Sequence, residues 1–203
     1  MPFYKDFSDE KATILIWKFS DDEILNANEL VEVENLEKIK NYHPTKILET
    51  LLVRKALKSF LPTHKILYKD REPYLSPQDH FISITHSFPF AAVAVSKEKI
   101  GIDMEKFNEK ILRIEHKFIY SNEANFFLEK EKVEYLTVIW SVKESLYKIH
   151  HSNYFSLKQN YKVEEFDLKN LHKINCSVYD ENNCDHFSAR VEFFEDYCFT
   201  IVD

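Results

Sequence analysis

The sequence predicts an α+β fold in two halves that meet near residue 100, with a first half at 1–102 and a second at 103–203. The chain has 203 residues, which suits one large domain or two small ones packed closely. Hydrophobic residues make up 44% and charged residues 30%, a normal globular balance. Each half contains helical and strand patterns, but not the regular alternation that is typical of a doubly wound sheet.

In the first half the strongest element is a helix from Thr45 to about Phe60, because apolar residues recur there with helical spacing. Pro44 separates it from weaker helical periodicity over 30–42. A short helix is predicted over 21–30. Strands are predicted over 12–19, 66–68, 81–86 and 90–96.

In the second half the strongest helix is predicted over 133–150. Further helices are predicted over 109–117 and over 121–131, the latter with Ser121 as its N-cap. Glu195-Asp196 is predicted to form a hairpin turn between the last two strands. The strands are predicted over 99–105, 161–166, 172–179, 186–194 and 197–202.

Charge and cysteine content exclude several classes of protein. Asp and Glu total 34 against 27 Lys and Arg, and the net charge of -7 argues against a general nucleic-acid binder. No apolar run approaches the roughly 18 residues that a membrane-spanning helix needs, and the first residues do not resemble a signal peptide. The three cysteines, Cys176, Cys184 and Cys198, form no CxxC pair. We therefore expect a reduced, cytoplasmic protein without nucleic-acid or membrane partners.

The chain contains a single glycine, Gly101, where average usage of about 7% predicts roughly 14. This excludes GxGxxG dinucleotide sites, P-loops and GxSxG elbows, since each of these motifs needs several glycines. Any phosphate must therefore be bound by side chains and a metal ion.

Two carboxylates occur at alternate positions of the strand predicted over 99–105. Asp103 and Glu105 share one face, and Ile102 and Met104 lie on the other. Two neighbouring carboxylates repel each other unless a cation or a proton lies between them, and Mg²⁺ prefers such oxygen ligands. The alternative is an ordinary edge strand with a solvated acidic face.

The helix over 133–150 carries a second candidate group. Trp140, Glu144 and Lys148 are spaced at i, i+4 and i+8, so they share one stripe that offers an acid for a metal and an ammonium for a phosphate. A surface Glu–Lys pair would produce the same spacing. Trp140 argues against that alternative, because tryptophan favours burial.

Two further segments could bind phosphate. His86 ends the strand over 81–86 on the side of Ile84, which suits either a phosphate contact or a hydrogen-bonded core histidine. Lys46 and Arg54 share a face of the helix that follows Pro44, and this face is alternatively only a solvated one.

These signals occur in a specific order: a basic helix, the strand ISITHS, the segment GIDME and, about 35 residues later, the segment WSVKESLYK. In this order they resemble the 4′-phosphopantetheinyl transferase superfamily, of the two-half type that activates surfactin synthetase. The resemblance runs from roughly His43 to Lys148, and GIDME and WSVKESLYK are its most specific parts. It implies a pseudo-dimer of two similar halves in a monomeric chain.

The resemblance implies transfer of the phosphopantetheine arm of coenzyme A to a serine of an apo acyl or peptidyl carrier protein, with release of adenosine 3′,5′-bisphosphate. It implies that Asp103, Glu105 and Glu144 hold Mg²⁺, with Mn²⁺ as the alternative because both ions accept oxygen ligands. Glu144 is the expected base for the serine hydroxyl, directly or through a water. Lys148 is expected to stabilise the departing bisphosphate, and His86 to contact phosphate.

The resemblance also implies which residues contact coenzyme A: Lys46, Arg54, Arg71, Pro73, Thr85, His86 and Lys148. The sequence departs from the family at two of these places. Thr85 stands where the family commonly has serine, and Arg71-Glu72-Pro73 replaces Gly-Lys-Pro, so that Glu72 occupies the place of the lysine.

The segment after GIDME is expected to form part of the surface that docks the carrier protein. Carrier proteins are acidic in most cases, so a basic face is needed to offset the net charge of this chain. An ordinary amphipathic helix, with Ile114 and Phe118 in the core, is the alternative. The expected basic contacts are Lys110, Arg113, His116 and Lys117, with Ile111, Leu112, Ile114 and Phe118 as apolar contacts.

Two other functions remain open from the sequence. A metal-dependent nuclease or phosphodiesterase could use Asp103, Glu105 and Glu144, although the acidic net charge argues against it. A non-catalytic protein that binds carrier proteins is favoured only by Glu72.

Gly101 stands where the family has a glycine, just before the carboxylates. Close backbone packing at the junction of the halves is the expected reason.

Overall fold

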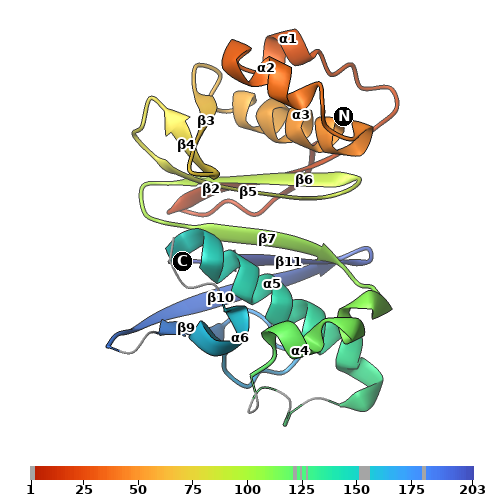
Figure 1. Cartoon of the computed structure of the whole chain (residues 1–203), viewed down its shortest axis with the longest axis vertical. Helices are drawn as coiled ribbons and strands as arrows, with labels where there is room; N and C mark the ends of the chain where they lie inside the picture. The colour runs from red at the N-terminus through yellow and green to blue at the C-terminus, as the bar shows by residue number, and fades with distance from the viewer. Residues whose placement is uncertain (1–2, 121–122, 124, 127, 151–155, 180–181) are drawn as a thin grey trace. The chain divides into compact units, whose positions relative to one another are not determined.

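The computed structural model describes residues 3–120, 123, 125–126, 128–150, 156–179 and 182–203. The chain divides into two compact units, Met1–Lys99 and Ile100–Asp203. Each unit contains an antiparallel sheet and helices that pack on it, as Figure 1 shows, so the predicted α+β class is confirmed. No helix in the described part of the chain is long and apolar enough to cross a membrane.

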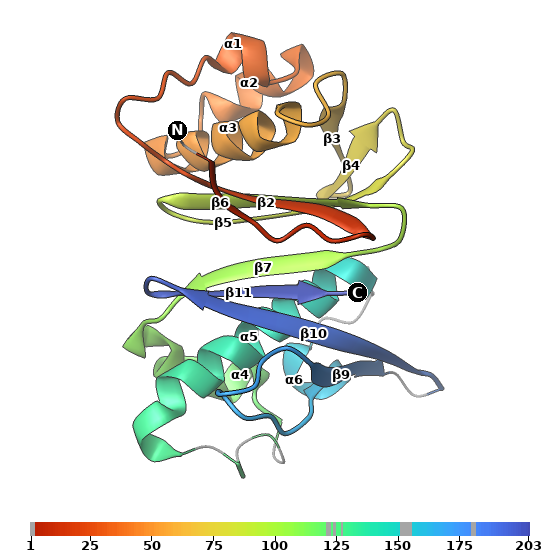
Figure 2. The ribbon, with the colours of Figure 1, turned by 180° about the vertical axis from the view of Figure 1, so that it is seen from behind.

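The first unit is a four-stranded sheet with three helices on one face (Figures 1 and 2). Helix α3 packs on β2, β5 and β6, and a separate hairpin, β3–β4, follows it in the chain. The sheet order is β1-β2-β6-β5. The elements are β1 (Phe3–Asp6), β2 (Ala12–Lys18), α1 (Ala27–Leu30), α2 (Val33–Ile39), α3 (Pro44–Lys58), β3 (Lys65–Lys69), β4 (Glu72–Ser76), β5 (Phe81–Ser87) and β6 (Phe90–Ser96).

The second unit is a five-stranded sheet, β7-β11-β10-β9-β8, against which the long helix α5 packs. The long strand β10 and its partner β11 are clearest in Figure 2. The strands are β7 (Gly101–Lys106), β8 (Tyr161–Val163), β9 (Ile174–Tyr179), β10 (Cys184–Phe194) and β11 (Tyr197–Val202). The α-helices are α4 (Glu115–Phe118), α5 (Lys132–His150) and α6 (Leu157–Asn160). Two 3-10 turns, Glu109–Arg113 and Glu129–Glu131, precede α4 and α5.

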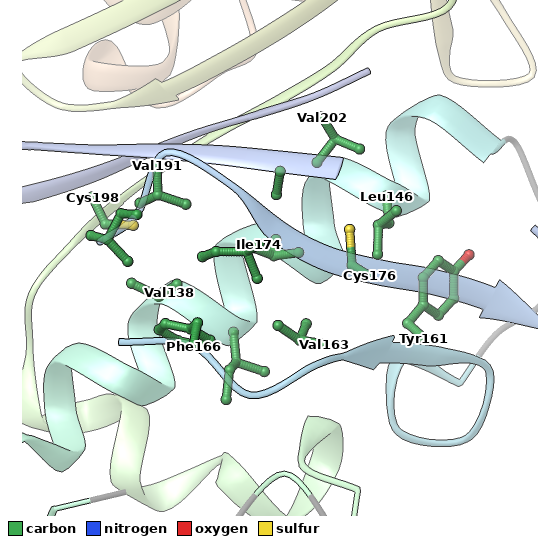
Figure 3. Packing of buried hydrophobic residues seen from close by; sticks show 14 of the residues in the cluster. Val138, Leu146, Tyr161, Val163, Phe166, Ile174, Cys176, Val191, Cys198 and Val202 are labelled. Atoms are coloured by element: carbon green, nitrogen blue, oxygen red, sulfur yellow. The ribbon is translucent and has the colours of Figure 1, made fainter. Parts of the chain in front are cut away.

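The core of the second unit lies between α5 and its sheet. Val138 and Leu146 of α5 point toward Ile174 and Cys176 of β9, as Figure 3 shows, and all four are at most 2% exposed. Such burial of apolar surface stabilises the folded state by about 25 cal/mol per Å². The spacing of the apolar residues on α5 is therefore what fixes the face that it turns toward the sheet.

Several predicted elements are shorter than expected. The helix over 21–30 is reduced to α1, because Asp21 and Asp22 form a turn, residues 23–26 are in neither helix nor strand, and Asn26 caps α1 by accepting from the N–H of Asn28. The helix over 109–117 is broken into a 3-10 turn and α4 at Ile114. The strand over 161–166 ends at Val163. Strands β1 and β4 were not predicted; β4 contains Pro73, which is rare inside strands except at edges.

Part of the helix predicted over 121–131 lies outside the described residues, including its N-cap Ser121. The described residues of this segment contain the 3-10 turn Glu129–Glu131 and no α-helix. The hairpin turn at Glu195-Asp196 is confirmed, and Glu195 adopts a φ of 47° in it.

Candidate active site

Strand β7 turns its polar face toward α5. Gly101, Asp103 and Glu105 alternate along β7, and each lies against a residue of α5. Ile102 and Met104, on the opposite face, are at most 1% exposed. The predicted alternation of faces is therefore what the structure shows, and it directs both carboxylates to the helix that carries the second motif.

Hydrogen bonds connect the two motifs. The Nζ of Lys148 donates to Asp103 Oδ1 at 2.8 Å and to the carbonyl oxygen of Ile102 at 2.8 Å. The Nε1 of Trp140 donates to Glu105 Oε1 at 2.9 Å. The stripe predicted from the spacing on α5 thus faces β7. Lys148 donates a hydrogen bond to one carboxylate of the strand, and Trp140 donates one to the other.

The carboxylates of this cluster interact electrostatically. Burial, and then the charges of Asp103 and Glu144, raise the pKa of Glu105 to about 7, while the hydrogen bond from Trp140 acts in the opposite direction. Burial, and then the charge of Asp103, also raise the pKa of Glu144. Glu144 therefore lies close to Asp103, and the structure gathers all three predicted metal ligands together with Lys148.

The donor set of this cluster fits a hard divalent cation. Three carboxyl groups face one ammonium group, and a cation relieves the repulsion that, after burial, raises the two glutamate pKa values. Within the described residues, the group whose ligand atoms all lie within 4.8 Å of one another is a different one, His64 with Asp79 and His80.

Lys143 belongs to the same motif but points away from the carboxylates. Its side chain is fully buried, and its Nζ donates to the carbonyl of Phe118 at 2.6 Å and to Glu123 Oε2 at 2.7 Å. Glu123 also accepts the backbone N–H groups of Tyr120 and Val163. Burial lowers the pKa of Lys143, and the charge of Glu123 opposes that shift. Lys143 therefore holds the fold around α5 and is not part of the cluster.

Replacing Lys143 with methionine is expected to destabilise the protein by about 3–5 kcal/mol, because Glu123 is then left as a buried charge without its counter-ion. Urea denaturation measures the change. Lys132→Met is the matched control on the same helix: its partner Glu115 is partly exposed, so the expected cost is below about 1 kcal/mol. Equal, small losses in both variants would contradict this role for Lys143.

The first unit contains a cavity of about 500 Å³ between its helices, the β3–β4 hairpin and β5. Its lining combines basic and aromatic side chains, which suits a nucleotide with phosphates. The polar and aromatic lining includes Lys38, Tyr42, Lys46, Tyr68, Arg71 and His86.

His86 lies between a cation and an anion at the wall of this cavity. Its Nε2 contacts the Nζ of Lys46, and its Nδ1 is 3.0 Å from Glu49 Oε2. Burial raises the pKa of Glu49, and the charge of Lys46 opposes that shift. Glu49 was not singled out from the sequence, although its position three residues after Lys46 on α3 places the two on one face.

The other predicted nucleotide contacts are placed differently. Arg54 reaches the cavity, but it is 2% exposed, and its Nε donates to Glu32 Oε2 at 3.2 Å. Thr85 is buried on the opposite face of β5 from His86. Neither Thr85 nor Pro73 is among the residues that line the cavity. The structure thus gathers Lys46, Arg71 and His86, and it gives Arg54 a buried ionic partner.

The predicted docking segment has a mixed character. Phe118 is fully buried, and Ile111 and Ile114 pack against the core of the second unit. Leu112 is 38% exposed. The four basic residues of the segment, Lys110, Arg113, His116 and Lys117, are all exposed.

Comparison with known proteins adds three findings. The model of the 4′-phosphopantetheinyl transferase superfamily matches residues 99–202, about half of the chain. The chain is 32% identical over 110 residues to the 4′-phosphopantetheinyl transferase gsp of Aneurinibacillus migulanus, and this alignment covers 50% of this chain and 46% of that protein. It is 37% identical over 75 residues to the 4′-phosphopantetheinyl transferase ffp of Bacillus subtilis, and this second alignment covers 36% of this chain and 33% of that protein. The matches thus span about half or less of the length of these relatives.

Proposed function

The chain belongs to the 4′-phosphopantetheinyl transferase superfamily, and on this premise we propose that it transfers the phosphopantetheine arm of coenzyme A to a serine of an apo acyl or peptidyl carrier protein. The observation that carries the proposal is the cluster of Asp103, Glu105, Glu144 and Lys148, which lies inside the matched residues 99–202. The other product is adenosine 3′,5′-bisphosphate.

In the proposed reaction the serine oxygen bonds to the phosphorus that carries the pantetheine arm. The bond from that phosphorus to the bridging pyrophosphate oxygen breaks, and the bisphosphate leaves with the electron pair. Glu144 accepts the serine proton, and its raised pKa makes it a better base than an ordinary carboxylate. Lys148 stabilises the charge that develops on the leaving group.

Asp103, Glu105 and Glu144 are the proposed ligands of Mg²⁺, or alternatively of Mn²⁺. When bound, the ion neutralises negative charge on the pyrophosphate. Trp140 fixes the orientation of Glu105 through its indole N–H, and Lys148 fixes that of Asp103. Pre-oriented ligands of this kind bind a metal with less loss of side-chain entropy.

The cavity of the first unit is the proposed site of the nucleotide end of coenzyme A. Lys46, Arg71 and His86 supply cationic or N–H groups for its phosphates, and Tyr42 and Tyr68 offer aromatic faces for a base. Glu49 Oε2, 3.0 Å from Nδ1 of His86, orients the imidazole ring of His86 at the wall of the cavity. Arg54 lines the same cavity but is held by Glu32, whereas Pro73, Thr85 and Glu72 do not line it and would act on this site only indirectly.

Lys46→Ala is expected to raise the KM for coenzyme A about ten-fold, because one charge-assisted contact to phosphate is lost, and to leave kcat nearly unchanged. Steady-state kinetics at varied coenzyme A concentration measures KM and kcat separately. The matched control is Lys58→Ala, which removes a lysine from the same helix but outside the cavity lining. A KM equal to that of the Lys58→Ala variant would count against this assignment.

We also propose that the two units are the halves of a pseudo-dimer, since each is an antiparallel sheet packed on a long helix, α3 or α5. The exposed basic residues after β7, with Leu112, are the proposed dock for an acidic carrier. A cytoplasmic location fits the three free cysteines, and a monomer is the oligomeric state that goes with two halves in one chain.

The reaction itself is tested by its nucleotide product. Chromatography of a mixture of this protein, coenzyme A, Mg²⁺ and an apo carrier protein should show adenosine 3′,5′-bisphosphate in equal amount to the carrier consumed. A carrier whose acceptor serine is replaced by alanine should yield none. Bisphosphate release that does not depend on the carrier serine would instead indicate a phosphodiesterase.

A further inference from the structure

Two loops of the first unit bring two histidines and an aspartate together, away from the cavity described above. His64 directly precedes β3, and Asp79 and His80 lie between β4 and β5. The hairpin register pairs Lys65 with Ser76, so the start of β3 lies beside the end of β4. None of the three residues lines the nucleotide cavity.

The side chains of this cluster converge on one carboxylate oxygen. His64 Nε2 is 2.9 Å from Asp79 Oδ1, and His80 Nδ1 is 3.0 Å from the same oxygen. The ligand atoms of all three residues lie within 4.8 Å of one another. Bonds of about 2.0–2.2 Å from imidazole nitrogen and carboxylate oxygen to Zn²⁺ require ligand atoms about 3.3 Å apart in a tetrahedron, which is close to these separations.

Hydrogen bonding does not account for the whole cluster. His64 Nε2 makes a hydrogen bond with Asp79 Oδ1, whereas His80 Nδ1, 3.0 Å from the same oxygen, approaches it outside the angles of a good hydrogen bond. A cation placed between the imidazole nitrogen and the carboxylate oxygen would satisfy both lone pairs. The neighbouring His80 and His64 lower the pKa of Asp79 to about 2, so Asp79 is charged throughout the physiological range.

We propose that His64, Asp79 and His80 form a second metal site, which binds a first-row transition ion such as Zn²⁺ and not Mg²⁺. Two imidazoles and one carboxylate are ligands that favour Zn²⁺ and its neighbours, whereas Mg²⁺ favours oxygen ligands alone. The side chains are 9% exposed at His64, 24% at His80 and 45% at Asp79. An ion therefore enters from the Asp79 side, and further ligand positions remain for water.

A metal at this place would tie the start of β3 to the loop before β5. Because the ion binds the folded state, it raises the stability of the protein with increasing free concentration. The effect belongs to the first unit and needs neither coenzyme A nor a carrier protein.

The test uses the full chain, freed of metal by a chelator and then dialysed against Zn²⁺ in excess Mg²⁺. Mg²⁺ is present to occupy the oxygen ligands of Asp103, Glu105 and Glu144. Bound zinc is measured by elemental analysis, and X-ray absorption reports the ligands. We expect one zinc ion per chain, two imidazole ligands and a higher melting temperature.

His80→Gln is the principal variant, because His80 is less buried than His64 and its loss threatens folding less. It should weaken zinc binding by at least about ten-fold and abolish the rise in melting temperature. The control is His186→Gln, which removes a histidine whose Nε2 lies 3.7 Å from the Sγ of Cys184, a second pair of groups of the kind that binds zinc. Equal zinc binding by the wild type and His80→Gln, or loss of binding only in His186→Gln, would overturn the proposal.

Discussion

Replacing Glu144 or Asp103 with alanine is expected to reduce turnover at least about 100-fold, because each variant removes a ligand of the proposed metal and, at Glu144, also the proposed base. Steady-state assays of carrier modification in excess Mg²⁺ measure the loss. The control is Glu134→Ala, which removes a carboxylate from the first turn of the same helix, away from the cluster. Near-full turnover in either variant would show that the site is assigned wrongly.

The two variants differ in what they do to the fold. The raised pKa of Glu144 means that burial disfavours its charge, so removal of this carboxylate should not lower the melting temperature. Asp103 is 5% exposed and accepts a hydrogen bond from Lys148, so its removal leaves the Lys148 ammonium without the carboxylate to which it donates. Asp103→Asn, which keeps a hydrogen-bond acceptor, separates lost chemistry from lost stability.

Gly101→Val is expected to destabilise the second unit by about 1–3 kcal/mol or more and to reduce turnover as well. A Cβ at residue 101 would lie 2.1 Å from the carbonyl oxygen of Ser145 and 2.9 Å from its carbonyl carbon. These are backbone atoms of a buried part of α5, so the helix itself must move. Since α5 carries Glu144 and Lys148, that movement displaces both from Asp103.

Thermal melting and turnover of Gly101→Ala and Gly101→Val measure this effect, and valine should be the more harmful. Ser145→Ala provides the control, because it removes the serine hydroxyl but leaves the carbonyl oxygen that the new Cβ would meet. Combining it with Gly101→Ala should therefore give no rescue. An unchanged melting temperature and unchanged turnover in Gly101→Val would contradict the explanation that a Cβ at residue 101 displaces α5.

For Gly101 the expected close packing is confirmed, but its expected place at the junction of the halves is not. The sequence predicts close backbone packing at the junction of the halves. The structure does show close packing, but the neighbour is Ser145 of α5 in the same unit. A glycine in a strand indicates that another backbone approaches, and it does not say which one.

Elements with strong periodicity were predicted well. Strands β6 and β11 have the predicted bounds, and α3 and α5 agree within two residues, because long apolar patterns fix both the type of element and the face that it buries. The breaks near Asn26 and Ile114 depend on local capping and turn geometry. Local capping and turn preferences leave only a weak pattern in the sequence, and tertiary packing determines where such a helix begins or ends.

The candidate site also contains residues that regular patterns predict and contacts that only tertiary packing creates. Asp103, Glu105, Glu144 and Lys148 meet because alternation on β7 and the i, i+4 stripe on α5 are both regular, and the family resemblance that rests on these motifs is confirmed by the match over residues 99–202. Contacts that depend on tertiary packing were missed. The ionic partner of Arg54 is Glu32, 22 residues away, and the cluster of His64 with Asp79 depends on the register of a hairpin.

The most direct test of the central claim is the intact mass of an apo acyl carrier protein after incubation with this protein, coenzyme A and Mg²⁺. The account predicts a mass gain of one phosphopantetheine arm, abolished by EDTA, restored by added Mg²⁺ and absent with Glu144→Ala. No gain on several apo carriers of the fatty-acid, polyketide and peptide classes, with the protein folded and Mg²⁺ present, would contradict it.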